Sequence, residues 1–274
     1  MTVPAPVVLR LHDIQVSFGG LCAVHVDSMV IRRSRIVGIV GANGAGKTTL
    51  FDVISGHVEP DKGSLLLDGR TELSGLSPTR RARLGIGRSF QNALLFESLT
   101  VAETLAVAYE RQVHRVGLIG GALRLPAARR GERRVREQVD GLVDVFGLGA
   151  FRDKFISELS TGSRRIVELA GILAMRPRLL LLDEPSSGIA QREVEALADL
   201  LRRVQSELEC TVVVIEHDIP MLRGLADELY AMETGRVIAH GTPDEVLSDP
   251  AVVRSYLGTD PVALERSGTA KEAS

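Results

Sequence analysis

Residues 35–55 read "RIVGIVGANGAGKTTLFDVIS", and this stretch sets the expected class of fold. It begins with an apolar run at 35–40, which is typical of a strand buried on both faces. Residues 41–49 then match the pattern G-x-x-x-x-G-K-[ST]. A helical segment follows at 47–55 and stops at Gly56, a common helix-ending residue. A strand, a glycine-rich loop and a helix in this order predict a loop that holds phosphate groups.

The residue types in and after this loop suit phosphate chemistry. Glycines let backbone N–H groups approach phosphate oxygens without an intervening Cβ. Lys47 adds a positive charge at the start of the helix, and the hydroxyl of Thr48 is a ligand for Mg²⁺. Such a loop needs an acidic residue at the end of a neighbouring strand. The run "LLLLDEP" at 179–185 supplies Asp183 for the metal and Glu184 to polarise an attacking water.

Three further residues each allow two interpretations from their surroundings alone. His217 directly follows the run "TVVVIE" at 211–216, where it would contact a phosphate or serve only as a loop residue. Gln91 either has a function or is simply solvated. Phe18 either stacks on a base or belongs to the core.

The loop "LSTGS" at 159–163 opens an amphipathic helix, because apolar residues recur there from Ile166 to Leu173 at helical spacing. Ser160 or Thr161 is expected to cap the helix, or an anion docks at its free N–H groups. Both interpretations stay open at this point.

The remaining segments predict an α/β core interrupted by a helical insertion. Residues 92–158 lack strand-like runs, and the arginine-rich stretch at 129–137 is expected to be a solvated helix face. An apolar helix face over 194–208 is expected to cover the sheet.

Composition limits the protein class further. The chain has 274 residues and a formal net charge of −2, which argues against general nucleic-acid binding. Two distant cysteines, Cys22 and Cys210, predict no disulfide framework and fit a reducing compartment. No apolar run approaches the roughly 20 residues that span a bilayer, and no leader is recognisable at the start, so we expect a cytoplasmic protein.

The order of these elements resembles the ATP-binding subunit of ABC transporters, over residues 7–258. The resemblance implies a P-loop NTPase (RecA-like) α/β core with a mostly parallel sheet, an N-terminal antiparallel β subdomain and an inserted α-helical subdomain. It also implies boundaries. The first segment of the core spans 7–91, the helical subdomain 92–164 and the second segment of the core 165–258, with tails at 1–6 and 259–274.

Carried over by position, the resemblance assigns roles to individual residues, with ATP and Mg²⁺ as cofactors. The implied ATP-binding residues are Phe18, Gly41, Asn43, Gly44, Gly46, Lys47, Thr48, Thr49, Ser160 and Gly162. The implied metal ligands are Thr48, Gln91 and Asp183. The implied catalytic residues are Glu184, His217 and Gln91, where Glu184 is the base and His217 the γ-phosphate sensor.

Longer stretches look like the hydrophobic amino-acid uptake branch of the family, whose relatives include urea and amide importers. They lie at 18–24, 85–105, 115–133 and 240–258. The implied function is ATP-driven import, with a second identical or different ATPase subunit, transmembrane permeases and, indirectly, a substrate-binding protein as partners. The permease would hold the chain at the inner face of the membrane. The alternatives are an exporter ATPase, such as a lipopolysaccharide-extracting one, and a soluble ABC protein on nucleic acid or ribosomes. The single ATPase cassette and the negative net charge of the chain disfavour a soluble ABC protein that acts on nucleic acid or ribosomes.

Two segments depart from the family pattern. The signature loop reads STGS where the family usually has SGGQ. Thr161 and Ser163 either vary the motif without effect or weaken transition-state stabilisation, and both interpretations stay open here. Ala190 stands where the family commonly has an aspartate at the dimer seam, which affects the expected communication between the two sites.

Overall fold

The computed structural model describes residues 6–89, 95–110, 126–189 and 191–257. They form two compact units, each described by itself. The core unit comprises residues 1–88 and 178–274, and the helical unit comprises 89–177.

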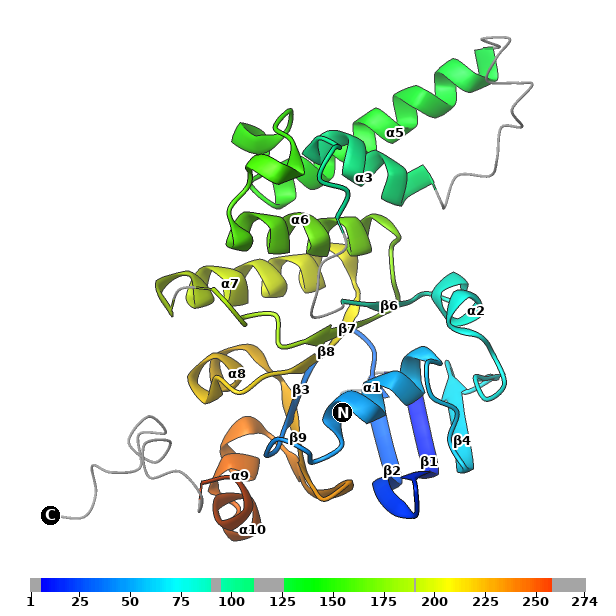
Figure 1. Cartoon of the computed structure of the whole chain (residues 1–274), viewed down its shortest axis with the longest axis vertical. Helices are drawn as coiled ribbons and strands as arrows, with labels where there is room; N and C mark the ends of the chain where they lie inside the picture. Colours follow the sequence, from blue (N-terminus) through cyan, green and yellow to red (C-terminus); the bar gives the residue numbers. More distant parts are fainter. Residues whose placement is uncertain (1–5, 90–94, 111–125, 190, 258–274) are drawn as a thin grey trace, which may run out of the picture. The chain divides into compact units, whose positions relative to one another are not determined.

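The core unit is built on a six-stranded sheet in the order β10-β9-β3-β8-β7-β6, shown in Figure 1. The five strands from β9 to β6 are parallel, and β10 pairs antiparallel with β9. Its strands are β3 (Ile36–Val40), β6 (Ile86–Arg88), β7 (Leu179–Asp183), β8 (Thr211–Ile215), β9 (Glu228–Glu233) and β10 (Arg236–Gly241). Its helices are α1 (Lys47–Ser55), α2 (Pro78–Arg83), α7 (Gln191–Leu208), α8 (Ile219–Leu225), α9 (Pro243–Ser248), α10 (Pro250–Val252) and the π-helical turn η3 (Val253–Leu257).

The central strands are apolar without alternation because both faces of the sheet are covered. Every residue of β3, β7 and β8 is buried. On one face, Ile39 and Leu181 share an apolar cluster with Phe51 of α1. On the other face, a Cβ at Gly38 would meet the side chain of Leu222 in α8. The predicted doubly covered parallel sheet is therefore confirmed.

A second sheet of four antiparallel strands, in the order β2-β1-β4-β5, completes the core unit. The strands are β1 (Val7–Phe18), β2 (Leu21–Arg32), β4 (Lys62–Leu67) and β5 (Thr71–Glu72). Inward residues such as Leu9 and Leu11 join the same cluster as Phe51, so α1 packs against both sheets. The hydroxyl of Tyr230 in β9 links the sheets, because it donates to Val30 O at 2.9 Å and accepts from Val30 N at 3.2 Å.

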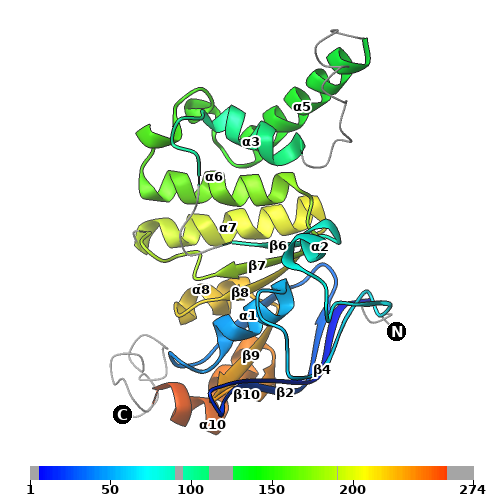
Figure 2. The ribbon, with the colours of Figure 1, turned by 45° about the vertical axis from the view of Figure 1, so that its right-hand side comes forward.

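In the part of the helical unit that the structure describes, the helices α3, α5 and α6 pack together and two short turns lie between α5 and α6 (Figure 2). Its elements are α3 (Val101–Glu110), α5 (Pro126–Val145), η1 (Gly149–Phe151), η2 (Ile156–Glu158) and α6 (Thr161–Ala174). The prediction placed the end of the helical subdomain at 164, whereas the compact unit runs to Pro177. The whole of α6 is included because it packs on α3 and α5. On α5, the arginines at 133, 134 and 136 are exposed, as expected for a solvated face.

The two cysteines both lie among the described residues. Cys22 is exposed and Cys210 is buried, and neither forms a disulfide. Burial raises the pKa of the Cys210 thiol to about 12. Across the described ranges, no helix is both long enough and apolar enough to cross a membrane.

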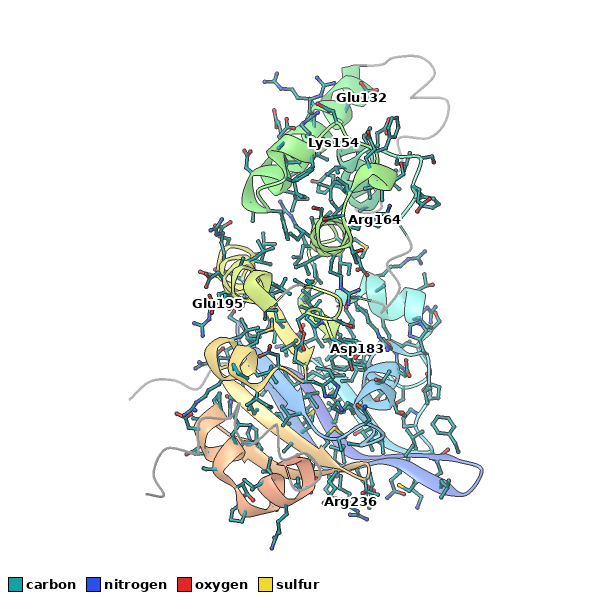
Figure 3. The ribbon with its side chains drawn as sticks, turned by 60° about the vertical axis from the view of Figure 1, so that its left-hand side comes forward. Glu132, Lys154, Arg164, Asp183, Glu195 and Arg236 are labelled. Carbon is teal, nitrogen blue, oxygen red and sulfur yellow. The ribbon has the colours of Figure 1, made fainter. Side chains whose placement is uncertain are left out.

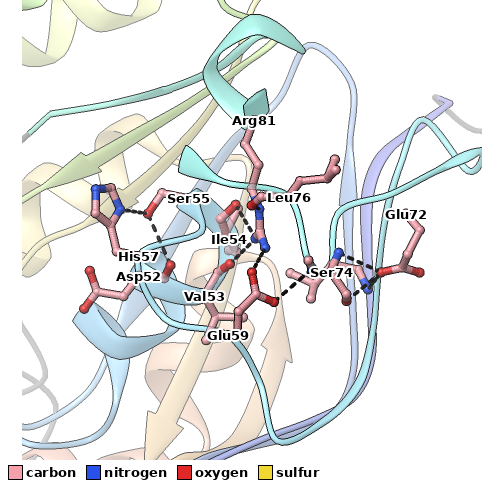
Figure 4. Close-up of polar contacts among 12 residues, drawn as sticks. Asp52, Val53, Ile54, Ser55, His57, Glu59, Glu72, Ser74, Leu76 and Arg81 are labelled. Atoms are coloured by element: carbon pink, nitrogen blue, oxygen red, sulfur yellow. Dashed lines mark hydrogen bonds and ion pairs between the residues drawn. The ribbon is translucent and has the colours of Figure 1, made fainter. Parts of the chain in front are cut away.

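A buried arginine closes the end of α1 (Figure 4). Arg81 of α2 is 0% exposed and donates to the carbonyls of Val53, Ile54 and Leu76. It also pairs with Glu59 at 2.9 Å. The last carbonyls of a helix lack partners within the helix, so this guanidinium supplies the missing donors. Burial lowers the pKa of Arg81, and the charge of Glu59 opposes this effect.

We predict that Arg81→Met destabilises the protein by about 2–4 kcal/mol, because buried carbonyls lose their donors. Urea unfolding measures this. Arg80→Met is the control, since Arg80 lies on the same helix and is exposed. Equal stability of the two variants would show that Arg81 does not hold the end of α1.

Candidate functional site

The glycine-rich loop needs glycine for packing as well as for ligand access. Gly41 and Gly46 have φ of 152° and 94°, and Gly46 is the residue that precedes α1. A Cβ at Gly46 would collide with the carbonyl oxygen of Ala23, and one at Gly41 with that of Met232. Neighbouring backbone of β2 and β9 therefore leaves no room for any other residue at these two positions.

A distant turn holds the loop in place. Thr234 and Gly235 connect β9 to β10, and Gly235 N donates to Ala45 O at 3.0 Å. Gly235 O in turn accepts from His25 N in β2 at 2.7 Å. The loop is thus held by one hydrogen bond to a turn nearly at the other end of the described chain, and a second bond holds that turn to β2.

The ammonium group of Lys47 lies inside the curve of its own loop. It donates to Gly41 O at 2.6 Å and to Ala42 O at 3.0 Å, and the residue is 6% exposed. Burial lowers the pKa of Lys47, while the charges of Glu184 and Asp183 oppose this effect. A cation held at this point is suited to meet phosphate oxygens.

A pocket opens over this loop. The residues lining it are Ala23, Asn43, Gly44, Ala45, Gly46, Lys47, Thr48, Thr49 and Glu184. All the loop positions named from the sequence except Gly41 therefore share one pocket with Glu184, one of the two predicted acids.

Asp183 ends β7 beside the start of α1, and Figure 3 labels its side chain. It is 2% exposed, and burial raises the pKa of its carboxyl. A hydrogen bond to Thr48 and the charge of Arg88, whose Nη2 lies 3.9 Å from Asp183 Oδ2, oppose this effect. A carboxylate and a hydroxyl in contact are the oxygen ligands that Mg²⁺ prefers, so these residues fit that ion.

Sequence reasoning missed Arg88, which joins β6 to α1. Its Nη1 donates to Asp52 Oδ1 at 2.6 Å and to Ser55 Oγ at 2.8 Å. Its guanidinium carbon lies 5.9 Å from the ring centre of Phe51. No spacing rule connects an isolated arginine to a helix 33 residues or more away.

Glu184 follows Asp183 but leaves the line of the strand, because its φ is 49°. Its N–H donates to Ile215 O at 2.9 Å. Its Oε1 lies 2.9 Å from His217 Nε2, with both side chains about one-third exposed. The structure thus brings the two residues together at the carboxyl ends of β7 and β8.

A third acidic residue, Glu216, directly precedes His217 and was not identified from the sequence. It is 2% exposed. Its Oε1 accepts from Ser186 N at 2.7 Å, and its Oε2 accepts from His217 N at 3.1 Å. A signal was available in retrospect, since a glutamate at the end of a fully buried strand needs donors nearby.

In the helical unit, Ser160 caps α6. Its side chain accepts from Ser163 N at 3.2 Å and contacts Ser163 Oγ at 3.1 Å. The capping interpretation is confirmed. Gly162 lies in the first turn of α6, and ligand binding at this end stays a prediction.

The other predicted residues divide into two groups. Phe18 is 54% exposed at the end of β1, so the alternative that placed it in the core is wrong. Its stacking role stays a prediction. Gln91 and Ala190 lie outside the described residues.

Two family models match the chain. One, described as ABC transporter, matches residues 24–187. The other, described as branched-chain amino acid ATP-binding cassette transporter, matches residues 236–262.

Curated proteins match over nearly their whole length. LivG of Salmonella typhimurium, a high-affinity branched-chain amino acid transport ATP-binding protein, is 36% identical over 91% of this chain and 97% of its own. BraF of Pseudomonas aeruginosa, which carries the same description, is 35% identical over 92% and 98%. The lipopolysaccharide export ATP-binding protein LptB of Haemophilus influenzae is 32% identical over 92% and 97%.

A solved structure shares the fold. The ADP conformation of MJ1267, an ATP-binding cassette of an ABC transporter, superposes with a TM-score of 0.78 at 27% identity. The match covers 92% of this chain and 99% of that one.

We predict that Asp183→Asn stabilises the protein without added metal or nucleotide. A raised pKa means that folding favours the protonated carboxyl, so ionised Asp183 lowers stability at neutral pH. The expected gain in Tm at pH 7.5 is about 2–4 °C, equivalent to about 1 kcal/mol at this size. The gain should shrink as the pH falls towards the pKa of an unfolded aspartate, because the native carboxyl then protonates as well.

Thermal unfolding across this pH range measures the effect. Asp27→Asn is the control, because its side chain is 82% exposed and its loss should change stability by less than about 0.5 kcal/mol. A lower Tm for Asp183→Asn at pH 7.5 would contradict the prediction.

Proposed function

Because the chain belongs to the ABC transporter family, and is an ATPase of that family, we propose that it powers import of branched-chain or related hydrophobic amino acids. Two observations support the substrate class. The second family model covers the end of the core unit, and LivG and BraF match over nearly full length. LptB is less similar, so an exporter is the weaker alternative.

ATP is proposed to bind across the pocket of the glycine-rich loop. Phe18 would stack on the adenine, since its ring is exposed at a hairpin end. Backbone N–H groups of residues 43–49 and the ammonium of Lys47 would meet the β- and γ-phosphates. Lys47 is held by two carbonyl oxygens, so little reorganisation is needed.

Mg²⁺ is proposed to be held by Thr48 and Asp183, with Gln91 as a further ligand. The contact between the Thr48 hydroxyl and the Asp183 carboxylate supports this assignment. When bound, the ion neutralises charge on the phosphates. Asp183 must be ionised to ligate it, and the nearby Arg88 favours that state.

Glu184 is proposed as the base that accepts a proton from the attacking water. It lines the pocket over the loop and is oriented by His217 at 2.9 Å. His217 would detect the γ-phosphate, because it lies at the same edge of the sheet. Loss of that phosphate then changes the contacts of this pair.

A second ATPase subunit is proposed to complete each site, arranged head to tail. Ser160 and Gly162, at the start of α6, would contribute a hydroxyl and N–H groups to the γ-phosphate held by the partner copy. ATP, which bridges two subunits, favours the closed dimer more than ADP does. This difference would drive transport through permease subunits, which would hold the chain at the inner face of the membrane. A substrate-binding protein would deliver the substrate to the permease.

Amino-acid uptake tests the substrate class. We expect a strain that lacks this chain to lose high-affinity uptake of radiolabelled leucine, and the intact chain to restore it. Unchanged uptake together with accumulated lipopolysaccharide at the inner membrane would instead identify an exporter. Stable association with ribosomes or DNA, without any membrane protein, would refute both.

We predict that Glu184→Gln abolishes ATP turnover, by about 100-fold or more, and traps an ATP-bound dimer. The variant keeps the shape of the side chain but cannot accept a proton. Phosphate release and gel filtration with ATP measure the two effects. Glu207→Gln, at an exposed position of α7, should behave as wild type. Normal turnover by Glu184→Gln would refute its assignment as the base.

A further inference from the structure

Glu216 holds a position that the proposed chemistry does not use. It lies between the last residue of β8 and His217, and it is almost fully buried at 2% exposed. A buried carboxylate is costly unless its oxygens accept hydrogen bonds. Here each oxygen accepts one backbone N–H, Oε1 from Ser186 at 2.7 Å and Oε2 from His217 at 3.1 Å.

The two N–H groups belong to the segments that carry the reacting side chains. Ser186 lies in the turn after β7, where Ser187 N donates to Glu184 O at 3.0 Å. His217 N lies in the segment after β8. The two segments also meet directly, because Glu184 N donates to Ile215 O at 2.9 Å. The two oxygens of Glu216 therefore link the turn after β7, which carries Glu184, to the segment after β8, which carries His217.

We propose that Glu216 is a positioning residue, whose carboxylate holds the two segments at the separation where Glu184 and His217 meet. This inference rests on the proposed roles of those two residues. Only a carboxylate offers two acceptors in this geometry. A glutamine would turn an NH₂ donor towards one of the N–H groups, which leaves that buried group unpaired.

A second carboxylate that accepts a backbone N–H, the more exposed Asp227, lies at the opposite end of the sheet and provides a comparison. Asp227 Oδ2 accepts from Ile36 N at 2.8 Å, at the amino ends of β3 and β9. The bond is of the same kind, yet it lies away from the carboxyl ends where the pocket opens. Its loss should affect stability and leave the reaction unchanged.

The experiment compares purified Glu216→Gln, Asp227→Ala and the wild-type chain. For Glu216→Gln we expect kcat to fall about 10- to 100-fold, as for a small misplacement of reacting groups. KM for ATP should stay within about twofold, because the phosphate loop is untouched. Asp227→Ala, which removes the acceptor of the Ile36 N–H, should lower stability in urea and keep kcat within about twofold.

Amide hydrogen exchange supplies a readout that does not depend on activity. The N–H of Ser186 or His217 should exchange faster in Glu216→Gln than in wild type, while amides of β3 and the phosphate loop stay unchanged. Should the glutamine variant fail to fold, Glu216→Asp is measured in the same way. It keeps the charge and shortens the side chain by one methylene.

The outcomes separate the two levels of the proposal. A wild-type chain without ATPase activity would refute the proposed function. Amide hydrogen exchange would then still test whether Glu216 holds the two segments together. Wild-type kcat with unchanged exchange in Glu216→Gln would refute the positioning role. The positioning role would also be refuted if Asp227→Ala showed a loss of kcat in the same proportion to its loss of stability.

Discussion

Apolar cover on both faces of the parallel sheet governs where charge can lie in the core unit. Every residue of β3, β7 and β8 is buried, so polar side chains are admitted only where these strands end. Because the strands are parallel, their carboxyl ends share one edge. Lys47, Asp183 and His217 gather there for that reason.

Asp183 and Glu184 are adjacent in sequence but have different surroundings, because the backbone changes direction at Glu184. Asp183 continues β7 and stays buried beside Thr48 and Arg88, which suits a metal ligand. Glu184 has a φ of 49° and turns out of the strand to meet His217. Strain at a non-glycine residue is retained where surrounding bonds impose it, and here Ile215 O and the turn at Ser187 supply those bonds.

Local pattern was enough to predict the main elements and several site residues. The loop at 41–49, the acids at 183 and 184 and the cap at Ser160 all follow from spacing over a few positions. Arg81, Arg88 and Glu216 could not be found this way, because each bonds to groups remote in sequence, such as Val53 or Ser186. The compact helical unit runs to Pro177, beyond the expected end at 164, because α6 packs on α3 and α5, and such packing is not visible in local pattern.

The bond from Gly235 to Ala45 has a consequence for the order of synthesis. The phosphate loop is made early, yet its strand β3 pairs only with β8 and β9, and its last support comes from the turn after β9. A nascent chain that has not yet passed residue 235 lacks these partners. The segments that support the phosphate loop are therefore complete only after residue 235 has been made, when the helical unit has already been synthesised.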